Sequence, residues 1–195
     1  FLVGDLSGIY LDICKDRLYC DGLDSDSRRG AQSAMYLILK SLLSLYAPII
    51  TYTVDEALDF APSILKKEFS SVFDLNYFSI PEVAFDGDCG YMLESRDNFF
   101  EIVDSLKKSK TIGSTLELAL FSEDEDFVSK DDFCDWFTVS KKGVINGEMK
   151  GLGEFKADEK RFVIAKSEGK KCPRCWKYES KEEGELCPRC KEVVG

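Results

Sequence analysis

The sequence has 195 residues, of which 44% are hydrophobic and 12% aromatic, so it can bury one core, or one core plus a small module that needs outside help to fold. No apolar run reaches the roughly 20 residues that would cross a bilayer, and no membrane partner is expected. The net charge of −10 argues against non-specific coating of nucleic acid, but a local site stays compatible with it because charges act over about 8–10 Å.

Amphipathic periodicity predicts three helices in the first part of the chain. The sequence begins with a phenylalanine already inside such a pattern, so we expect it to be a piece of a longer protein. Apolar spacings of three and four predict helices over 1–20 and 28–47, the second stopped by a proline. Thr53 and Glu56 match a capping box, so a third helix is expected to begin at Thr53 and to end near Pro62. Short connections favour antiparallel packing of these helices in a bundle.

The middle of the chain is expected to be mixed. Residues 69–95 read as irregular, and a further helix is predicted over 96–110. After it the hydrophobic period drops toward two, which indicates strands. The expected strands are 115–122, 135–145 and 161–167. The aromatic residues expected to pack onto the bundle are Phe69, Phe73, Tyr77 and Phe78.

Charge is unevenly placed along the second half. Residues 122–135 hold seven acidic residues against one lysine, and we interpret this stretch as a solvated face. Residues 170–178 are the opposite, because they carry four basic residues and no acidic one. The four basic residues are Lys170, Lys171, Arg174 and Lys177.

Two Cys-Pro-Arg-Cys knuckles close the sequence, with eleven residues between them. Each tight turn supplies two thiolates, and two such turns close a tetrahedron, so the spacing predicts one Zn²⁺. Four thiolates leave no open position for water, so the ion is expected to be structural and to replace the core that this segment lacks. The predicted ligands are Cys172, Cys175, Cys187 and Cys190.

Two other interpretations of the knuckles fit less well. Disulfides would need an oxidising compartment, whereas the remaining cysteines are scattered singly, which indicates a reducing one. A redox-active pair would need a βαβ setting, which the sequence does not predict. The remaining cysteines are Cys14, Cys20, Cys89 and Cys134.

Trp176 directly follows a predicted ligand, so the metal would fix its backbone. Its ring either packs against the α+β part or forms a platform on which unpaired RNA bases stack. For the second interpretation, Arg174 could stack on or hydrogen-bond to a base, and Lys177 would act as a point charge.

At these residues the sequence resembles a known family. The stretch KSEGKKCPRCWKY…LCPRC strongly resembles the carboxy-terminal zinc module of bacterial isoleucyl-tRNA synthetases. DLSGIYLDICKDRLYCD at 5–21, SRRGAQSAMYLILKSLLSLYAPIITYTVDEAL at 27–58 and KKSKTIGSTLELAL at 107–120 resemble the helical anticodon-binding domain of that family and the segment after it, in the same order. The resemblance covers nearly the whole chain and is weakest over 121–165.

The resemblance implies a cytoplasmic ligase that uses ATP to attach isoleucine to its tRNA. No catalytic residue is expected here, since a chain without histidine cannot hold the histidine-containing catalytic motif. ATP is therefore expected only in an absent catalytic domain, and the editing domain is absent too. The implied partners are the anticodon stem–loop of isoleucine tRNA and the remainder of the synthetase chain, with no DNA.

The resemblance also implies a fold and a set of RNA contacts. The expected fold is mainly α, of the class I synthetase anticodon-binding type, over 1–95, then a small α+β connecting unit over 96–165 and a four-cysteine zinc ribbon or knuckle module over 166–195. RNA contacts carry over to Arg174 and Trp176, because CPRCW matches residue for residue. The further candidates for phosphate contacts are Arg17, Arg28 and Arg29, for which surface solubility is the equal alternative.

Two rival functions stay open at this point. A zinc ribbon that binds another protein would keep the metal and give Trp176 a protein pocket to fill. A DNA-repair glycosylase of the formamidopyrimidine type has a similar terminal finger, but its chemistry needs an amino-terminal proline, and the first residue here is Phe1.

Overall fold

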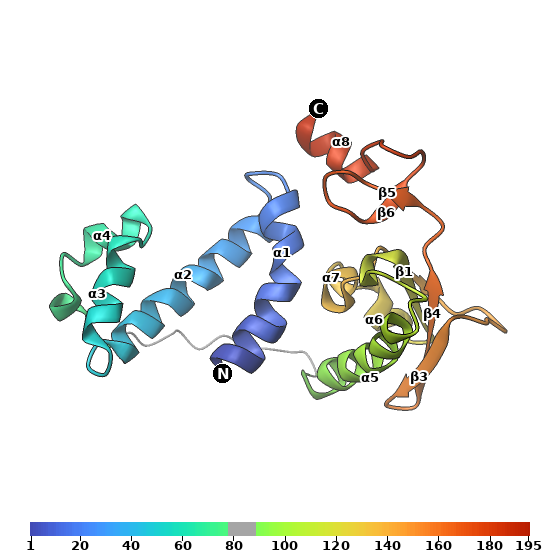
Figure 1. Cartoon of the computed structure of the whole chain (residues 1–195), viewed down its shortest axis with the longest axis horizontal. Helices are drawn as coiled ribbons and strands as arrows, with labels where there is room; N and C mark the ends of the chain where they lie inside the picture. Colours follow the sequence, from blue (N-terminus) through green and yellow to red (C-terminus); the bar gives the residue numbers. More distant parts are fainter. Residues whose placement is uncertain (78–88) are drawn as a thin grey trace. The chain divides into compact units, whose positions relative to one another are not determined.

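The computed structural model describes residues 1–77 and 89–195, except for the side chain of Cys89 (Figure 1). About half of the chain is helical, and a small sheet and a cluster of four cysteines follow the long helices. Among the helices of the described residues, none combines the length and the apolar character that crossing a bilayer requires.

The chain divides into two compact units. Unit 1 consists of Phe1–Gly22 and Gly87–Gly195, and unit 2 of Leu23–Asp86, so unit 2 is inserted in the sequence between the two segments of unit 1. The first predicted helix therefore belongs to the unit that carries the sheet and the cysteines. The expected bundle is only partly confirmed: the second and third helices pack together in unit 2 without the first.

Unit 2 is built on the long helix α2 (Asp26–Tyr46), which periodicity predicts. It begins two residues earlier than expected because Ser25 caps it, its Oγ accepting the N–H of Arg28 at 3.3 Å. α3 (Thr51–Asp59) and α4 (Ser63–Glu68) pack against its second half. The buried residues of this core are Leu43, Val54, Leu58, Ala61, Leu65 and Val72.

The predicted capping box at Thr53 is wrong. α3 already begins at Thr51, whose hydroxyl donates to the carbonyl of Ala47 at 2.7 Å, so Thr53 lies inside the first turn. The capping box in this region is formed instead by Ser71 and Asp74, at the short 3₁₀ helix η2 (Val72–Asp74).

The aromatic residues after α4 do not all pack onto the helices. Phe69 packs against the core of unit 2 and lies 5.5 Å from the Lys40 ammonium, as a cation–π pair. Phe73 and Tyr77 are exposed, which contradicts the prediction, and Phe78 lies outside the described residues.

Unit 1 begins with two consecutive helical segments where one amphipathic helix is predicted. A π-helical segment, η1 (Leu2–Tyr10), leads into α1 (Leu11–Cys20). Arg96, of which only 5% is exposed, donates to the Asp12 carboxylate of α1 at 2.9 Å and to the carbonyl of Trp136. This paired, buried guanidinium holds α1 against the α+β part of the same unit.

The α+β part combines α5 (Cys89–Lys108) with a four-stranded sheet of order β2-β1-β4-β3. α5 begins seven residues before its predicted start, so residues 89–95 are helical and not irregular. β1 pairs with β2 in parallel and with β4 antiparallel, and β3 pairs with β4 antiparallel. The strands are β1 (Leu118–Ser122), β2 (Lys141–Val144), β3 (Gly153–Ala157) and β4 (Lys160–Lys166).

The strand predictions are confirmed for 161–167, confirmed in part for the other two, and missed for β3. The stretch predicted as a strand over 115–122 opens with a 3₁₀ turn, η3 (Thr115–Glu117). The first residues of the stretch 135–145 belong to the short helix α7 (Phe133–Phe137), which ends at Thr138 in left-handed backbone. With α6 (Glu125–Ser129), α7 makes the crossover between the parallel strands β1 and β2.

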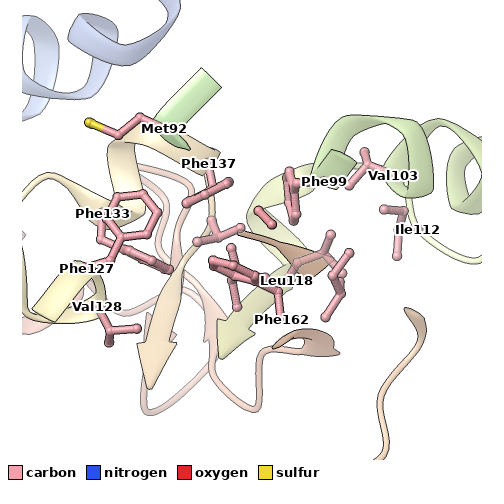
Figure 2. Close-up of a cluster of buried hydrophobic side chains, with 14 residues drawn as sticks. Met92, Phe99, Val103, Ile112, Leu118, Phe127, Val128, Phe133, Phe137 and Phe162 are labelled. Atoms are coloured by element: carbon pink, nitrogen blue, oxygen red, sulfur yellow. The ribbon is translucent and has the colours of Figure 1, made fainter. Parts of the chain in front are cut away.

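One aromatic core joins these elements (Figure 2). Phe99 of α5 meets Phe137 of α7 edge to face, with centroids 5.4 Å apart, and Phe155 stacks on Phe162 across β3 and β4 at 4.7 Å. The largest fully buried side chains include Phe99, Phe133, Phe137 and Phe162. Packing of α5 on the sheet therefore depends on aromatic contacts.

We predict that Phe99→Ala destabilises unit 1 by about 3–5 kcal/mol, since it empties a fully buried site. Urea unfolding followed by tryptophan fluorescence measures this loss, because both tryptophans lie in unit 1. Tyr19→Ala is the control, because that ring is exposed and its loss should change stability by less than about 0.5 kcal/mol. Equal losses in the two variants would contradict the described core.

Candidate metal centre and the surface beside it

The four predicted metal ligands meet at one point of unit 1. The first knuckle follows strand β5 (Lys170–Lys171) and precedes β6 (Tyr178–Ser180), and the second opens helix α8 (Pro188–Val194). All four cysteines are buried and their sulfur atoms lie within 4.8 Å of one another, and Cys175 Sγ is 3.7 Å from Cys187 Sγ. A tetrahedral zinc–thiolate site with bonds of about 2.3 Å has edges of about 3.8 Å. The cluster therefore fits one metal ion.

The backbone prepares the first knuckle for a thiolate. Cys172 N–H donates to the Lys177 carbonyl at 2.9 Å, and Trp176 N–H donates to the Cys172 carbonyl at 3.0 Å. Burial by itself would raise the pKa of the Cys172 thiol, but N–H donors, among them that of Cys187 at 3.4 Å, lower it to about 6. Burial raises the pKa of the Cys175 thiol, so a bound cation would displace a proton there.

The module is fastened to the sheet by short hydrogen bonds. The buried hydroxyl of Ser140 accepts the N–H of Tyr178 at 2.6 Å and donates to the Leu116 carbonyl at 2.5 Å. Ser167 donates to the Tyr178 carbonyl at 2.9 Å. A side chain at Gly169 would place its Cβ well inside van der Waals contact with that carbonyl oxygen, so this close approach requires glycine.

A partly buried ion cluster joins the module to α1 and α7. Asp16 of α1 accepts two hydrogen bonds from Arg189, at 2.6 and 2.9 Å, and lies 3.1 Å from the Lys177 ammonium. Lys177, only 8% exposed, also lies 3.4 Å from Asp135, which accepts from Arg17 at 2.9 Å. Burial would raise the pKa of Asp16, but hydrogen bonding to Arg189 and the charge of Lys177 lower it to about 2. The Asp16 carboxylate is therefore charged at neutral pH.

Arg174 makes a second link between the metal centre and α1. Its guanidinium donates to the carbonyl of Cys20 at 2.6 Å and to Cys190 Sγ at 3.4 Å. Cys20 is the last residue of α1, and its side chain packs against the four clustered cysteines.

Trp176 is presented outward on this rigid turn. Its side chain is 59% exposed, and the residue adopts left-handed backbone with φ +65°, which side-chain-bearing residues rarely adopt. The Lys171 ammonium lies over the indole, 5.3 Å from the ring centroid. Trp176 forms part of the wall of a pocket of about 500 Å³ between the module and α1. Other residues of its wall are Lys15, Tyr19, Thr115 and Arg174.

A family model described as the anticodon-binding domain of tRNA ligase matches residues 1–122 of this sequence. The chain belongs to that family. It is similar to isoleucine–tRNA ligases of Campylobacter hominis, with 50% identity over 185 residues, and of Nitratiruptor sp., with 49% over 196 residues. These matches cover 93% and 100% of this chain, but 20% and 21% of the two relatives. The isoleucine–tRNA ligase of Sulfurovum sp. is 48% identical over 199 residues, 100% of this chain and 21% of that protein. The chain thus spans about a fifth of the length of these relatives.

Within this anticodon-binding family member, the predicted RNA contacts lie in different surroundings. Trp176 is exposed. Arg174 donates to the carbonyl of Cys20 and to the sulfur of Cys190, whereas Lys177 and Arg17 both pair with Asp135. Arg28 and Arg29 lie at the start of α2 in unit 2, where Arg29 pairs with Asp24 at 2.8 Å. Direct RNA contact by each of these residues stays a prediction.

Sequence reasoning missed Asp16 and Arg189, and it misread Asp135. Asp135 was assigned to a solvated acidic face, yet its side chain is 13% exposed and binds two cations. Arg189 had a signal, since it occupies the same place in the second Cys-Pro-Arg-Cys knuckle as Arg174 does in the first. No pattern in the sequence points to Asp16, because its partner Arg189 is 173 residues away.

We predict that Cys187→Ser abolishes metal binding, since three thiolates and a poorer hydroxyl ligand replace a closed set of four. The tail should then become sensitive to proteolysis, while the helical circular dichroism stays close to that of the parent protein. Cys134→Ser is the matched control and should keep one metal per chain by elemental analysis. A Cys187→Ser protein with full metal content would remove this residue from the ligand set.

Proposed function

We propose that this chain is the tRNA-recognition region of an isoleucine–tRNA ligase and that it binds the anticodon stem–loop of isoleucine tRNA. The family match and the names of three relatives support this proposal. The ligase reaction, with ATP and isoleucine, belongs to the whole protein, and the remainder of that protein is the partner of this chain. The cytoplasm is the compartment where such a reaction serves protein synthesis.

The ion in the cysteine cluster is proposed to be one Zn²⁺. Four thiolates in a closed tetrahedral set are the ligands of structural zinc sites, and the sulfur spacing fits the bond lengths of this metal. When bound, zinc supplies folding free energy and no chemistry. The ligands Cys172, Cys175, Cys187 and Cys190 hold both knuckles, and the first knuckle sets the direction of the indole that follows it.

The exposed indole of Trp176 is the observation that carries the proposed RNA contact. A ring that served only as a lid would be buried, whereas this one is 59% exposed on a turn in left-handed backbone. Stacking of a base on an aromatic ring needs such an open face, and nearby cations suit the adjacent phosphates. Lys171 supplies exposed positive charge beside it, and Lys170, the residue before Lys171, is exposed as well.

The remaining candidate contacts complete the proposal. Arg28 and Arg29 are proposed to meet phosphates of the stem, and Arg17, Arg174 and Lys177 to contribute at the module. The division into a helical part, 1–95, a connecting unit, 96–165, and a zinc module, 166–195, is proposed as the domain organisation of this region.

We predict that Trp176→Ala lowers affinity for the anticodon stem–loop of isoleucine tRNA about 5- to 150-fold, which corresponds to the loss of about 1–3 kcal/mol for one stacked base. Fluorescence anisotropy of labelled stem–loop at fixed salt measures the change, and metal content should not change. Tyr52→Ala, which removes an exposed ring from α3, is the control and should bind as the parent protein does. Equal affinities of the parent and Trp176→Ala proteins would remove the indole from the contact.

Salt dependence separates RNA binding from the rival role in protein contact. Binding of the stem–loop should weaken steeply between about 50 and 200 mM salt, because phosphate neutralisation releases counterions. Insertion of an indole into an apolar protein pocket would depend little on salt. A flat salt profile, together with equal binding of an unrelated RNA hairpin, would argue for the protein-contact function.

A further inference from the structure

Each of the two knuckles carries one arginine, and both arginines lie beside the metal centre. Arg174 of the first knuckle donates to the sulfur of Cys190 in the second. Arg189 of the second knuckle has a buried Nε without an oxygen or nitrogen partner among the described residues. Hydrogen bonding to Asp16 is the main cause that raises the pKa of Arg189, and the Cys175 sulfur of the first knuckle adds to it. Arg174 thus contacts the second cysteine of the opposite knuckle, and Arg189 directly precedes Cys190 in its own knuckle.

The same two arginines also bind the last turns of α1. Arg174 donates to the carbonyl of Cys20, one of the terminal carbonyls that lack a partner within the helix. Arg189 grips both oxygens of Asp16 as a fork and reaches Asp21 at 3.3 Å. A cation at this end of the helix is also favoured by the helix dipole.

The negative charge of the metal–thiolate cluster explains why two arginines lie beside it. Four thiolates and one divalent ion leave a formal charge of about −2 on the cluster, by the charges of the ligands and the metal. In a buried site this excess needs compensation, and two guanidinium groups supply it. Such groups around a metal orient its ligands and alter affinity by about 10- to 100-fold.

We propose that Arg174 and Arg189 are positioning residues that clamp the metal-loaded knuckles onto the last turns of α1. Each neutralises the thiolate cluster on one side and binds α1 on the other, so the knuckles are docked only while the cluster is intact. Because Trp176 lies next to the first knuckle and shares a pocket with α1, the clamp also sets where the indole stands. Only this last step rests on the proposed function.

The first experiment compares Arg174→Ala and Arg189→Ala in the full chain, loaded with zinc. We expect zinc transfer to a chromogenic chelator to be about 10-fold faster in both variants. We also expect faster hydrogen exchange of the amides at the end of α1. Arg161→Ala is the control, because that guanidinium binds Glu154 and the Met149 carbonyl on the sheet and should change neither measurement. Unchanged zinc transfer and exchange in both knuckle variants would overturn the proposal.

The second experiment uses Asp16→Asn, which leaves both knuckles chemically intact. The clamp predicts faster hydrogen exchange at the end of α1 in this variant. It also predicts that the double variant Asp16→Asn/Arg189→Ala exchanges no faster there than Arg189→Ala alone. Arg189→Lys keeps the charge but loses the fork, so zinc transfer should return to within about threefold of the parent rate while exchange stays fast. Additive effects of Asp16→Asn and Arg189→Ala, or equal zinc transfer in the Lys and Ala variants, would contradict the clamp.

Binding of the stem–loop separates this proposal from the proposed function. The parent chain could fail to bind RNA while the arginine variants show the expected changes in zinc transfer and hydrogen exchange. In that case the clamp is supported, and its role in placing Trp176 for RNA is contradicted. If RNA binding holds and the arginine variants exchange like the parent, the proposed function stands and the clamp falls.

Discussion

The docking of the metal module in unit 1 depends on one half-buried carboxylate, that of Asp16. It receives Arg189 and Lys177 from the metal module, and through Lys177 it is linked to Asp135 of α7. Buried ion pairs contribute less to net stability than their Coulomb energy suggests, because desolvation opposes them, but an unpaired charge left in such a site costs several kcal/mol. The cluster therefore favours one docked position of the module over others. Together with the Arg96–Asp12 pair, it binds α1 to the other elements of unit 1.

The sequence predicted what is local and missed what is distant. Four cysteines in two knuckles have a fixed spacing, and the period of 28–47 is strong, so the ligand set and α2 could be expected. The last three residues of α7 were predicted as strand because aromatic residues favour strands, whereas in the structure Phe137 packs from a helix against Phe99 and Phe162. Thr53 matched the pattern of a capping box, but α3 begins two residues earlier, at Thr51, whose hydroxyl donates to the carbonyl of Ala47.

The structure also explains how an acidic chain can offer a surface to a polyanion. Asp16 and Asp135 face inward, onto arginine and lysine side chains, and so they add little to the potential above the first knuckle. Lys171 lies over the indole, and it and Lys170 are exposed. The net charge of −10 is therefore a poor guide to the field at this face, which charges within about 8–10 Å determine.

The insertion of unit 2 between the two segments of unit 1 has a consequence for the order of folding. On the ribosome, Asp16 emerges 173 residues before Arg189, a delay of roughly 10–30 s at the usual rates of translation. Unit 2 is contiguous and can form during this interval, while the contacts of α1 with the metal module must wait for the second knuckle. Chaperones that hold nascent helices, and the supply of metal once the second knuckle has emerged, would therefore govern the yield of the native chain.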